Sequence, residues 1–251
     1  MPLVGASLWR RDRESSYPLE ETMNLIWLDF TDTAFTGPLL LTLKVASLAT
    51  AAALVFGVAA AYFLSRRSFP CRDFVDAICT LPMVMPPTVL GYYLLVFIGR
   101  KGVLGEWLLE NFGIRLMFTW QGAVIAAAVV AFPLVFKSAR AALEGVGGQY
   151  EDAARTMGQG ELAVFLRVSF PLAFRGILSG TMLAFARAMG EFGATLMVAG
   201  NLPGRTQTLS LAVYSAVQAG NDGLANTLVL VISIVCVIIL MATGKLLQPR
   251  Y

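Results

Sequence analysis

Long stretches without charged side chains alternate with short polar segments along the chain and predict several membrane-spanning helices. Four ranges contain no Asp, Glu, Lys or Arg: 45–65, 77–99, 116–136 and 223–244. A helix that crosses the hydrocarbon core of a bilayer needs about 20 mostly apolar residues, and each range meets this length. The pattern therefore predicts four uninterrupted spans.

A fifth span is predicted from about Pro171 to Ala199, where Arg187 and Glu191 interrupt the apolar sequence. Because these two residues are four positions apart, they lie on the same side of a helix and are able to pair. Charged side chains inside a membrane are costly unless they face protein. Two interpretations remain open: a structural ion pair, or a gate in which Arg187 offers positive charge to a passing anion.

Together these patterns predict an all-α integral membrane protein with one transmembrane domain, residues 37–248. The predicted spans are about 37–64, 77–99, 116–138, 171–199 and 223–246. Segment 206–221 is also uncharged, but it is short and rich in Ser, Thr, Gln and Asn. We expect it to form a helix at the membrane edge, and a sixth crossing is the alternative.

Three prolines, Pro82, Pro86 and Pro87, fall inside the predicted span 77–99. Each removes a helix donor and frees carbonyl groups that neighbouring protein or water must satisfy. They predict a kink that packs the bundle or a broken helix that lines a pathway, and both can hold. Pro86, Pro87, Arg187 and Glu191 are therefore the candidate pathway or gate residues.

The composition agrees with a membrane protein and excludes several kinds of chemistry. Hydrophobic residues make up 57% of the 251 residues and charged residues only 14%, against roughly 25% in a soluble domain. The sequence has no His, which excludes imidazole metal sites and His acid–base catalysis. Cys71, Cys79 and Cys236 lack the spacing of a metal site or disulfide framework, so we predict free thiols and no metal. The net charge of +3 is spread over small clusters, which argues against nucleic acid as a partner.

The distribution of Lys and Arg among the short loops predicts the orientation of the chain. Ten lie in the segments 66–72, 137–175 and 245–250, whereas the other short loops carry four. Because Lys and Arg are enriched in cytoplasmic loops, we predict a multi-pass protein of the inner (plasma) membrane with its N-terminus outside and its C-terminus in the cytoplasm. Residues 1–36 are then an extracytoplasmic tail, and Met23 is an alternative start to Met1.

The loop 145–170 contains a short amphipathic helix in the sequence GGQYEDAARTMGQGELAVFLRVSFP. An apolar stripe at helical spacing is formed by Tyr150, Ala153, Ala154 and Met157. The charged residues Glu151, Asp152 and Arg155 occupy the opposite or flanking faces, and Gly158 suits the left-handed residue that ends a helix. A helix on lipid headgroups is one interpretation, but such helices are rich in Lys or Arg with large apolar anchors. The small stripe favours a groove in a protein partner.

The stretch from Asp152 to Pro171 resembles the EAA loop of ABC importer permeases. That loop has Glu-Ala-Ala, three residues, Gly, nine residues, Ile, one residue, Leu and Pro. The matching residues here are Asp152, Ala153, Ala154, Gly158, Val168, Phe170 and Pro171. The resemblance extends from Thr42 over nearly all the rest of the chain, in stretches such as SFPCRDFVDAICTLPMVMPPTVLGYYLL and FARAMGEFGAT, and is greatest to molybdate permease subunits. Sulfate and thiosulfate permease subunits are similar over much of the same range.

The resemblance implies a MetI-like type I ABC importer fold with five spans and a short cytoplasmic coupling helix at residues 149–158. It also implies a homodimer that contacts membrane lipid, a dimer of cytoplasmic subunits that bind ATP and Mg, and an extracytoplasmic molybdate-binding protein. The residues it assigns to coupling are Tyr150, Glu151, Asp152, Ala153, Ala154, Arg155, Met157 and Gly158. The implied function is import of molybdate, driven by ATP hydrolysis on the separate subunit, with no cofactor on this chain.

The residues themselves argue against an ATPase site in this chain. The pair Gly244 and Lys245 is followed by Leu246, and Ile239 stands where a phosphate-binding loop needs Gly. We therefore expect a transporter subunit and not an enzyme. The alternatives are a permease for sulfate, thiosulfate or tungstate, and an ion-coupled secondary carrier. Five spans without an inverted repeat, and one intramembrane carboxylate, argue against the carrier.

Overall fold

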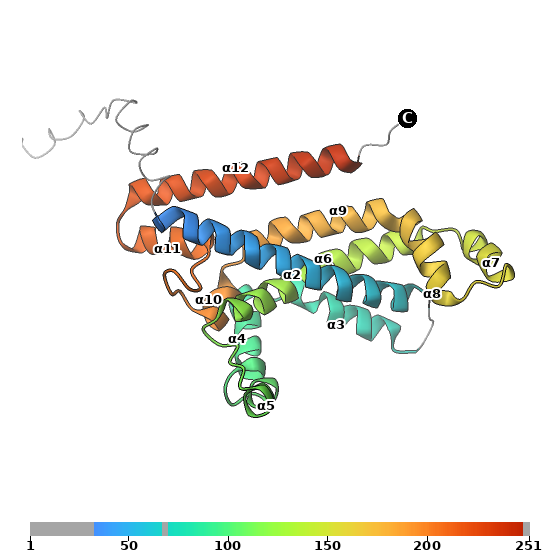
Figure 1. The fold of residues 1–251 in the computed structure, drawn as a ribbon, viewed down its shortest axis with the longest axis horizontal. Coiled ribbons are helices and arrows are strands. Elements are labelled where there is room, and N and C mark those ends of the chain that lie inside the picture. The colour runs from blue at the N-terminus through green and yellow to red at the C-terminus, as the bar shows by residue number, and fades with distance from the viewer. Residues whose placement is uncertain (1–32, 67–69, 248–251) are drawn as a thin grey trace, which may run out of the picture. The chain divides into compact units, whose positions relative to one another are not determined.

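The computed structural model describes residues 33–66 and 70–247, and all regular elements among them are helices. The chain divides into two units, 1–36 and 37–251. The predicted tail 1–36 and the choice between Met1 and Met23 lie almost entirely outside the described residues. Figure 1 shows the helices, which are α2 (Thr33–Arg66), α3 (Arg72–Val84), α4 (Pro87–Ile98), α5 (Val103–Phe112), α6 (Trp120–Glu144), α7 (Gly148–Thr156), α8 (Glu161–Val164), the π-helical η1 (Phe165–Ser169), α9 (Phe170–Met189), α10 (Gly193–Ala199), α11 (Leu209–Gln218) and α12 (Asp222–Leu247).

Four long apolar helices and one bent pair supply up to five membrane spans in the described part of the chain. The helices long enough to cross are Phe35–Arg66, Trp120–Glu144, Glu161–Met189 and Asp222–Met241. This confirms the predicted fold class. The helix Glu161–Met189 begins about ten residues before the predicted span 171–199 and ends at Met189, because Gly190 to Phe192 interrupt it. The positions at which these helices enter and leave the membrane remain a prediction.

The fifth candidate span is a pair of helices, α3 and α4, bent by 114° at the break between them. Met85 and Pro86 are extended there, with ψ angles of 142° and 135°. Pro86 and Pro87 both lack an N–H group, and Pro87 is the first residue of α4, where a proline is well tolerated. The structure therefore has a break where the sequence predicted a kink or a broken helix, and Pro82 lies inside α3.

The segment 206–221 contains α11, a helix of ten residues. At a rise of 1.5 Å per residue it spans about 15 Å, which is half of the hydrocarbon thickness. Its first amide, on Leu209, donates to the buried hydroxyl of Thr42 on α2 at 2.8 Å. Leu209 and Leu211 are fully buried. The helix therefore packs against the bundle and does not cross a membrane alone.

The helices α6 and α9 pack closely against each other and lie side by side in Figure 1. A Cβ placed on Gly180 would overlap the Cβ of Ser138, and one on Gly176 would lie 2.5 Å from the Cβ of Ala142. Small residues permit this close approach. In lipid, where no hydrophobic effect drives helices together, the van der Waals contacts of such close packing stabilise the pair. The two helices therefore pack with their backbones close together.

Gly180→Ala is expected to lower the free energy of unfolding by ~1–3 kcal/mol, because the added methyl group forces α6 and α9 apart. Thermal unfolding of the purified protein in detergent measures the change. Gly244→Ala on α12 is the matched control, since a Cβ there meets nothing within 4 Å. An unchanged melting temperature for Gly180→Ala would show that the two helices separate locally at no cost.

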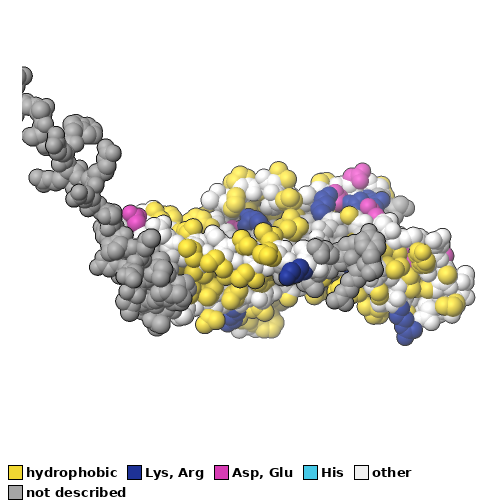
Figure 2. All heavy atoms as spheres, turned by 90° about the horizontal axis from the view of Figure 1, so that it is seen from above, with side chains coloured by type: hydrophobic (Ala, Val, Ile, Leu, Met, Phe, Trp, Pro, Cys, Tyr) yellow, Lys and Arg dark blue, Asp and Glu magenta, His cyan; other side chains and the backbone are white. Residues whose placement is uncertain are grey.

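Apolar side chains are spread widely over the visible face in Figure 2, and charged side chains gather most densely toward the end that carries α7 in Figure 1. The helix α12 shows the same apolar character along its length. Val237, Ile238 and Met241 expose 53%, 59% and 62% of their surface. A face of this kind is stable only against lipid or another apolar surface.

Candidate functional site

The predicted amphipathic helix in the loop 145–170 is present as α7, at one end of the bundle (Figure 1). Glu151 lies in its first turn and Arg155 in its last, which suits the helix dipole. Gly158 has a φ of +79°, and its amide donates to the carbonyl of Arg155 at 2.9 Å. The expectation that Gly158 ends the helix in the left-handed conformation is confirmed.

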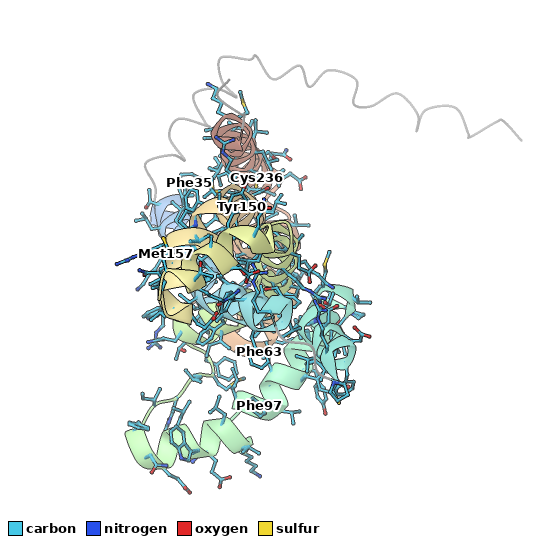
Figure 3. All side chains as sticks on the ribbon, turned by 90° about the vertical axis from the view of Figure 1, so that its right-hand side faces the viewer. Phe35, Phe63, Phe97, Tyr150, Met157 and Cys236 are labelled. Carbon is cyan, nitrogen blue, oxygen red and sulfur yellow. The ribbon has the colours of Figure 1, made fainter. Side chains whose placement is uncertain are left out.

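One face of α7 is open to the surroundings. Tyr150 and Met157 expose 54% and 76% of their surface, and Ala153 between them is also exposed. Figure 3 looks onto this end of the molecule and labels Tyr150 and Met157. Ala154, the fourth member of the predicted stripe, is buried within the chain itself. The exposed part of the stripe is therefore Tyr150, Ala153 and Met157.

The buried face of α7 is held by Glu151, which is only 2% exposed. Its carboxylate accepts hydrogen bonds from the guanidinium of Arg66, at the end of α2, and from the hydroxyl of Ser169 at 2.5 Å. The guanidinium of Arg66 also donates to the carbonyl of Leu143 on α6, at 3.3 Å. The sequence did not single out Arg66 and Ser169, because neither belongs to the loop pattern and Arg66 lies 85 positions from Glu151.

The other charged residues of α7 are more exposed than Glu151, and Arg155 also lies 3.7 Å from the Glu151 carboxylate. Asp152 accepts a hydrogen bond from Arg155 at 2.8 Å, and Glu161 of α8 accepts another at 2.8 Å. The pKa of Arg155 is raised above the ordinary guanidinium value, chiefly because Glu161 and then Asp152 accept these bonds. Asp152 is 72% exposed, so of the two neighbouring acids Glu151 anchors the helix and Asp152 faces the surroundings.

A cavity of about 580 Å³ lies beside α7, between the end of α2 and α8. Its walls include Tyr62 and Arg66 from α2, Glu151 and Arg155 from α7, and Glu161 from α8. The end of the bundle that carries α7 is thus hollow and lined by charges of both signs.

A second cavity, of about 270 Å³, lies at the break between α3 and α4. It is lined by Pro82, Met83, Met85, Pro87, Leu90, Val130, Leu134 and Arg187. Two of the candidate pathway residues, Pro87 and Arg187, therefore meet in one cavity. Pro86 lies at the break itself, directly before Pro87. Arg187 is the only charged residue among those that line this space.

The predicted pairing of Arg187 with Glu191 is confirmed, at 2.8 Å between Nη1 and Oε2. Glu191 is buried, and its Oε1 accepts a hydrogen bond from the amide of Ala194 at 2.9 Å, which satisfies the first turn of α10. Of the two glycines beside this pair, Gly193 packs closely against Pro87. A Cβ on Gly190 would meet only backbone of the preceding helix turn, so no neighbouring helix lies against Gly190.

Metal ligands do not gather in the described part of the chain. No group of three or more His, Cys, Asp or Glu within 33–66 and 70–247 could hold a metal ion. Cys71, Cys79 and Cys236 are free, as predicted.

Residues 53–251 match the family model described as "binding-protein-dependent transport system inner membrane component". The chain is 46% identical over 205 residues to the molybdenum transport system permease protein ModB of Escherichia coli K12, covering 81% of this chain and 90% of that protein. It is 40% identical over 209 residues to YvgM of Bacillus subtilis 168, a putative molybdenum transport system permease protein, covering 82% and 91%. Identity to the sulfate transport system permease protein CysT of Escherichia coli K12 is 34% over 197 residues, covering 78% and 70%.

The fold is similar to that of a solved ABC importer. A chain of the methionine ABC transporter MetNI, in an inward-facing conformation, superposes with a TM-score of 0.63, covering 92% of this chain and 97% of that one. At 17% sequence identity the likeness concerns the fold alone.

Proposed function

Because the chain belongs to the family of binding-protein-dependent transport system inner membrane components, we propose that it is the membrane subunit of an ATP-driven molybdate importer. The observation that carries the proposal is the 46% identity to a molybdenum permease over 81% of the chain, against 34% for the sulfate permease CysT. A permease for tungstate, or for sulfate or thiosulfate, is the alternative. A dianion that enters a cell with a negative interior needs on the order of 4.6 kcal/mol per 100 mV, so an energy source is required.

In this proposal α7 is the coupling helix that docks into a cytoplasmic ATPase subunit, which binds ATP and Mg. The support is its open face of Tyr150, Ala153 and Met157, with Asp152 beside it. Small and apolar side chains on a short helix suit a groove in a protein partner. The chain itself supplies no catalytic residue.

The cavity at the break between α3 and α4 is the proposed anion pathway of each subunit. Arg187 brings positive charge to walls that are otherwise apolar, which suits an anion that has left water. A homodimer in the lipid bilayer would hold two such cavities, and an extracytoplasmic molybdate-binding protein would deliver the anion. The excess of Lys and Arg near α7 supports a cytoplasmic position for α7 and the C-terminus, with the N-terminus outside.

Uptake of labelled molybdate, in cells that lack this gene and in complemented cells, tests the proposal. We expect complementation to restore uptake that resists excess sulfate and stops when ATP is depleted. Equal competition by sulfate would overturn the assignment of molybdate as the substrate, but it would not affect the assignment of the chain to its family. Uptake that stops with a dissipated ion gradient while ATP remains would favour a secondary carrier.

A further inference from the structure

A buried carboxylate at the base of α7 is not explained by docking to an ATPase. Glu151 is 2% exposed, and burial of a charge is costly unless the charge is paired and hydrogen-bonded. Its hydrogen-bond donors come from separate parts of the chain, since Arg66 ends α2 and Ser169 is the last residue of η1, and Arg155 of α7 itself lies 3.7 Å from the carboxylate. The carboxylate therefore joins α7 to two long helical segments at a single point.

The bond from Glu151 to Ser169 bypasses an irregular part of the chain. Between α7 and α9 lie the short helix α8 and the π-helical turn η1. Single π-helical turns interrupt the regular hydrogen bonds of a helix and are frequent at functional sites. Ser169 is completely buried and stands directly before Phe170, the first residue of α9. The hydrogen bond thus connects α7 directly to the residue before α9, without the intervening residues of α8 and η1.

The helix α9 is suited to carry such a movement across the bundle. It continues without a break from Phe170 to Met189, and Gly176 and Gly180 hold it tightly against α6. The 18 residues from Ser169 to Arg187 correspond to about 27 Å of helix. One end of this stiff element is therefore hydrogen-bonded to α7, and the other carries Arg187 into the cavity at Pro87.

We infer that Glu151 is a positioning residue that couples α7 to α9 through Ser169, so that movement of α7 displaces Arg187 in the pathway cavity. The inference rests on the proposed function, because it assigns the source of the movement to the ATPase subunit. It separates the roles of two neighbouring acids. Asp152, 72% exposed, faces the docking partner, whereas Glu151 transmits the movement inward.

The test measures molybdate transported per ATP hydrolysed by the complete assembly of permease, ATPase subunit and binding protein in proteoliposomes. Ser169→Ala removes the hydroxyl donor and leaves the pairing of Arg66 with Glu151 in place. We expect the ratio to fall about threefold or more while ATP hydrolysis and assembly persist. Thr181→Val is the matched control, since the hydroxyl of Thr181 lies on α9, the helix that follows Ser169, and donates to the carbonyl of Ile177. It should keep the ratio of the wild type.

A double-mutant cycle shows whether Ser169 acts through Glu151. If it does, Ser169→Ala causes no further loss in a Glu151→Ala background. A wild-type ratio for Ser169→Ala, or losses that multiply in the double variant, would overturn the inference. If Glu151→Ala does not assemble, the comparison of Ser169→Ala with Thr181→Val decides alone.

If the wild-type assembly takes up no molybdate, the proposed function fails and the inference with it. If the wild-type assembly transports molybdate and Ser169→Ala does so equally well, only the inference fails.

Discussion

Ala153→Arg is expected to reduce molybdate uptake by about a hundredfold or more, because it places a long charged side chain at the centre of the exposed face of α7. Ala153 is exposed and lies between Tyr150 and Met157 on that face. In the proposed docking groove the arginine would lose water without gaining a partner, at a cost of about 3 kcal/mol or more. The permease itself should fold normally, since the substitution touches no buried group.

Two measurements check this result: uptake in complemented cells, and co-purification of the ATPase subunit with the permease. Ala219→Arg is the matched control. Ala219 is also exposed, but it caps α11 at the opposite end of the bundle from α7 (Figure 1). We expect Ala153→Arg to lose the ATPase subunit and Ala219→Arg to retain it. If both variants fully retained the ATPase subunit, the exposed face of α7 would be excluded as the docking surface.

The sequence predicted the helical bundle well because the responsible signals are local. Uncharged stretches determine which helices are long and apolar, and a stripe at helical spacing indicated the existence of α7. The left-handed conformation of Gly158 also followed from its position after that stripe. Each of these features depends on residues within a few turns of one another.

The features that were missed depend on contacts between distant residues. Glu151 and Asp152 look equivalent in sequence, as two acids in the first turns of a helix. Only the folded chain distinguishes them, because Arg66 and Ser169 approach one of the two. The burial of Ala154 is likewise visible only in the folded chain, because the sequence pattern placed Ala154 on the same stripe as the exposed Ala153.

The helices within the predicted span 171–199 have other bounds than the apolar pattern indicates, and the reason is different. Apolar residues lie on both sides of Arg187 and Glu191, so the apolar pattern placed α9 and α10 in one span. The local signal was Glu191, which stands after Gly190 and three residues before Ala194, the spacing at which a side chain caps a helix N-terminus. The 114° break between α3 and α4 was only partly visible, since prolines indicate a break and packing of Gly193 on Pro87 accompanies it.

Arg187→Gln is expected to lower molybdate uptake by about thirtyfold, which corresponds to about 2 kcal/mol in the barrier for the anion. The substitution removes the only charge that lines the cavity at the break between α3 and α4. A dianion would then pass through apolar walls without a compensating positive charge. Arg187→Lys keeps the charge and should retain a larger part of the uptake.

Loss of uptake in Arg187→Gln has a second physical cause, because the substitution also leaves the buried carboxylate of Glu191 without its ion pair. The double variant Arg187→Gln/Glu191→Gln separates the two causes. The side-chain amide that Glu191→Gln introduces still offers an oxygen to the backbone N–H of Ala194, while the unpaired charge is removed. If the pathway needs positive charge, the double variant stays as inactive as Arg187→Gln, and Glu191→Gln alone remains active. Recovery of uptake in the double variant would instead assign Arg187 to the structural pair, since neutralising Glu191 would then be sufficient to restore transport.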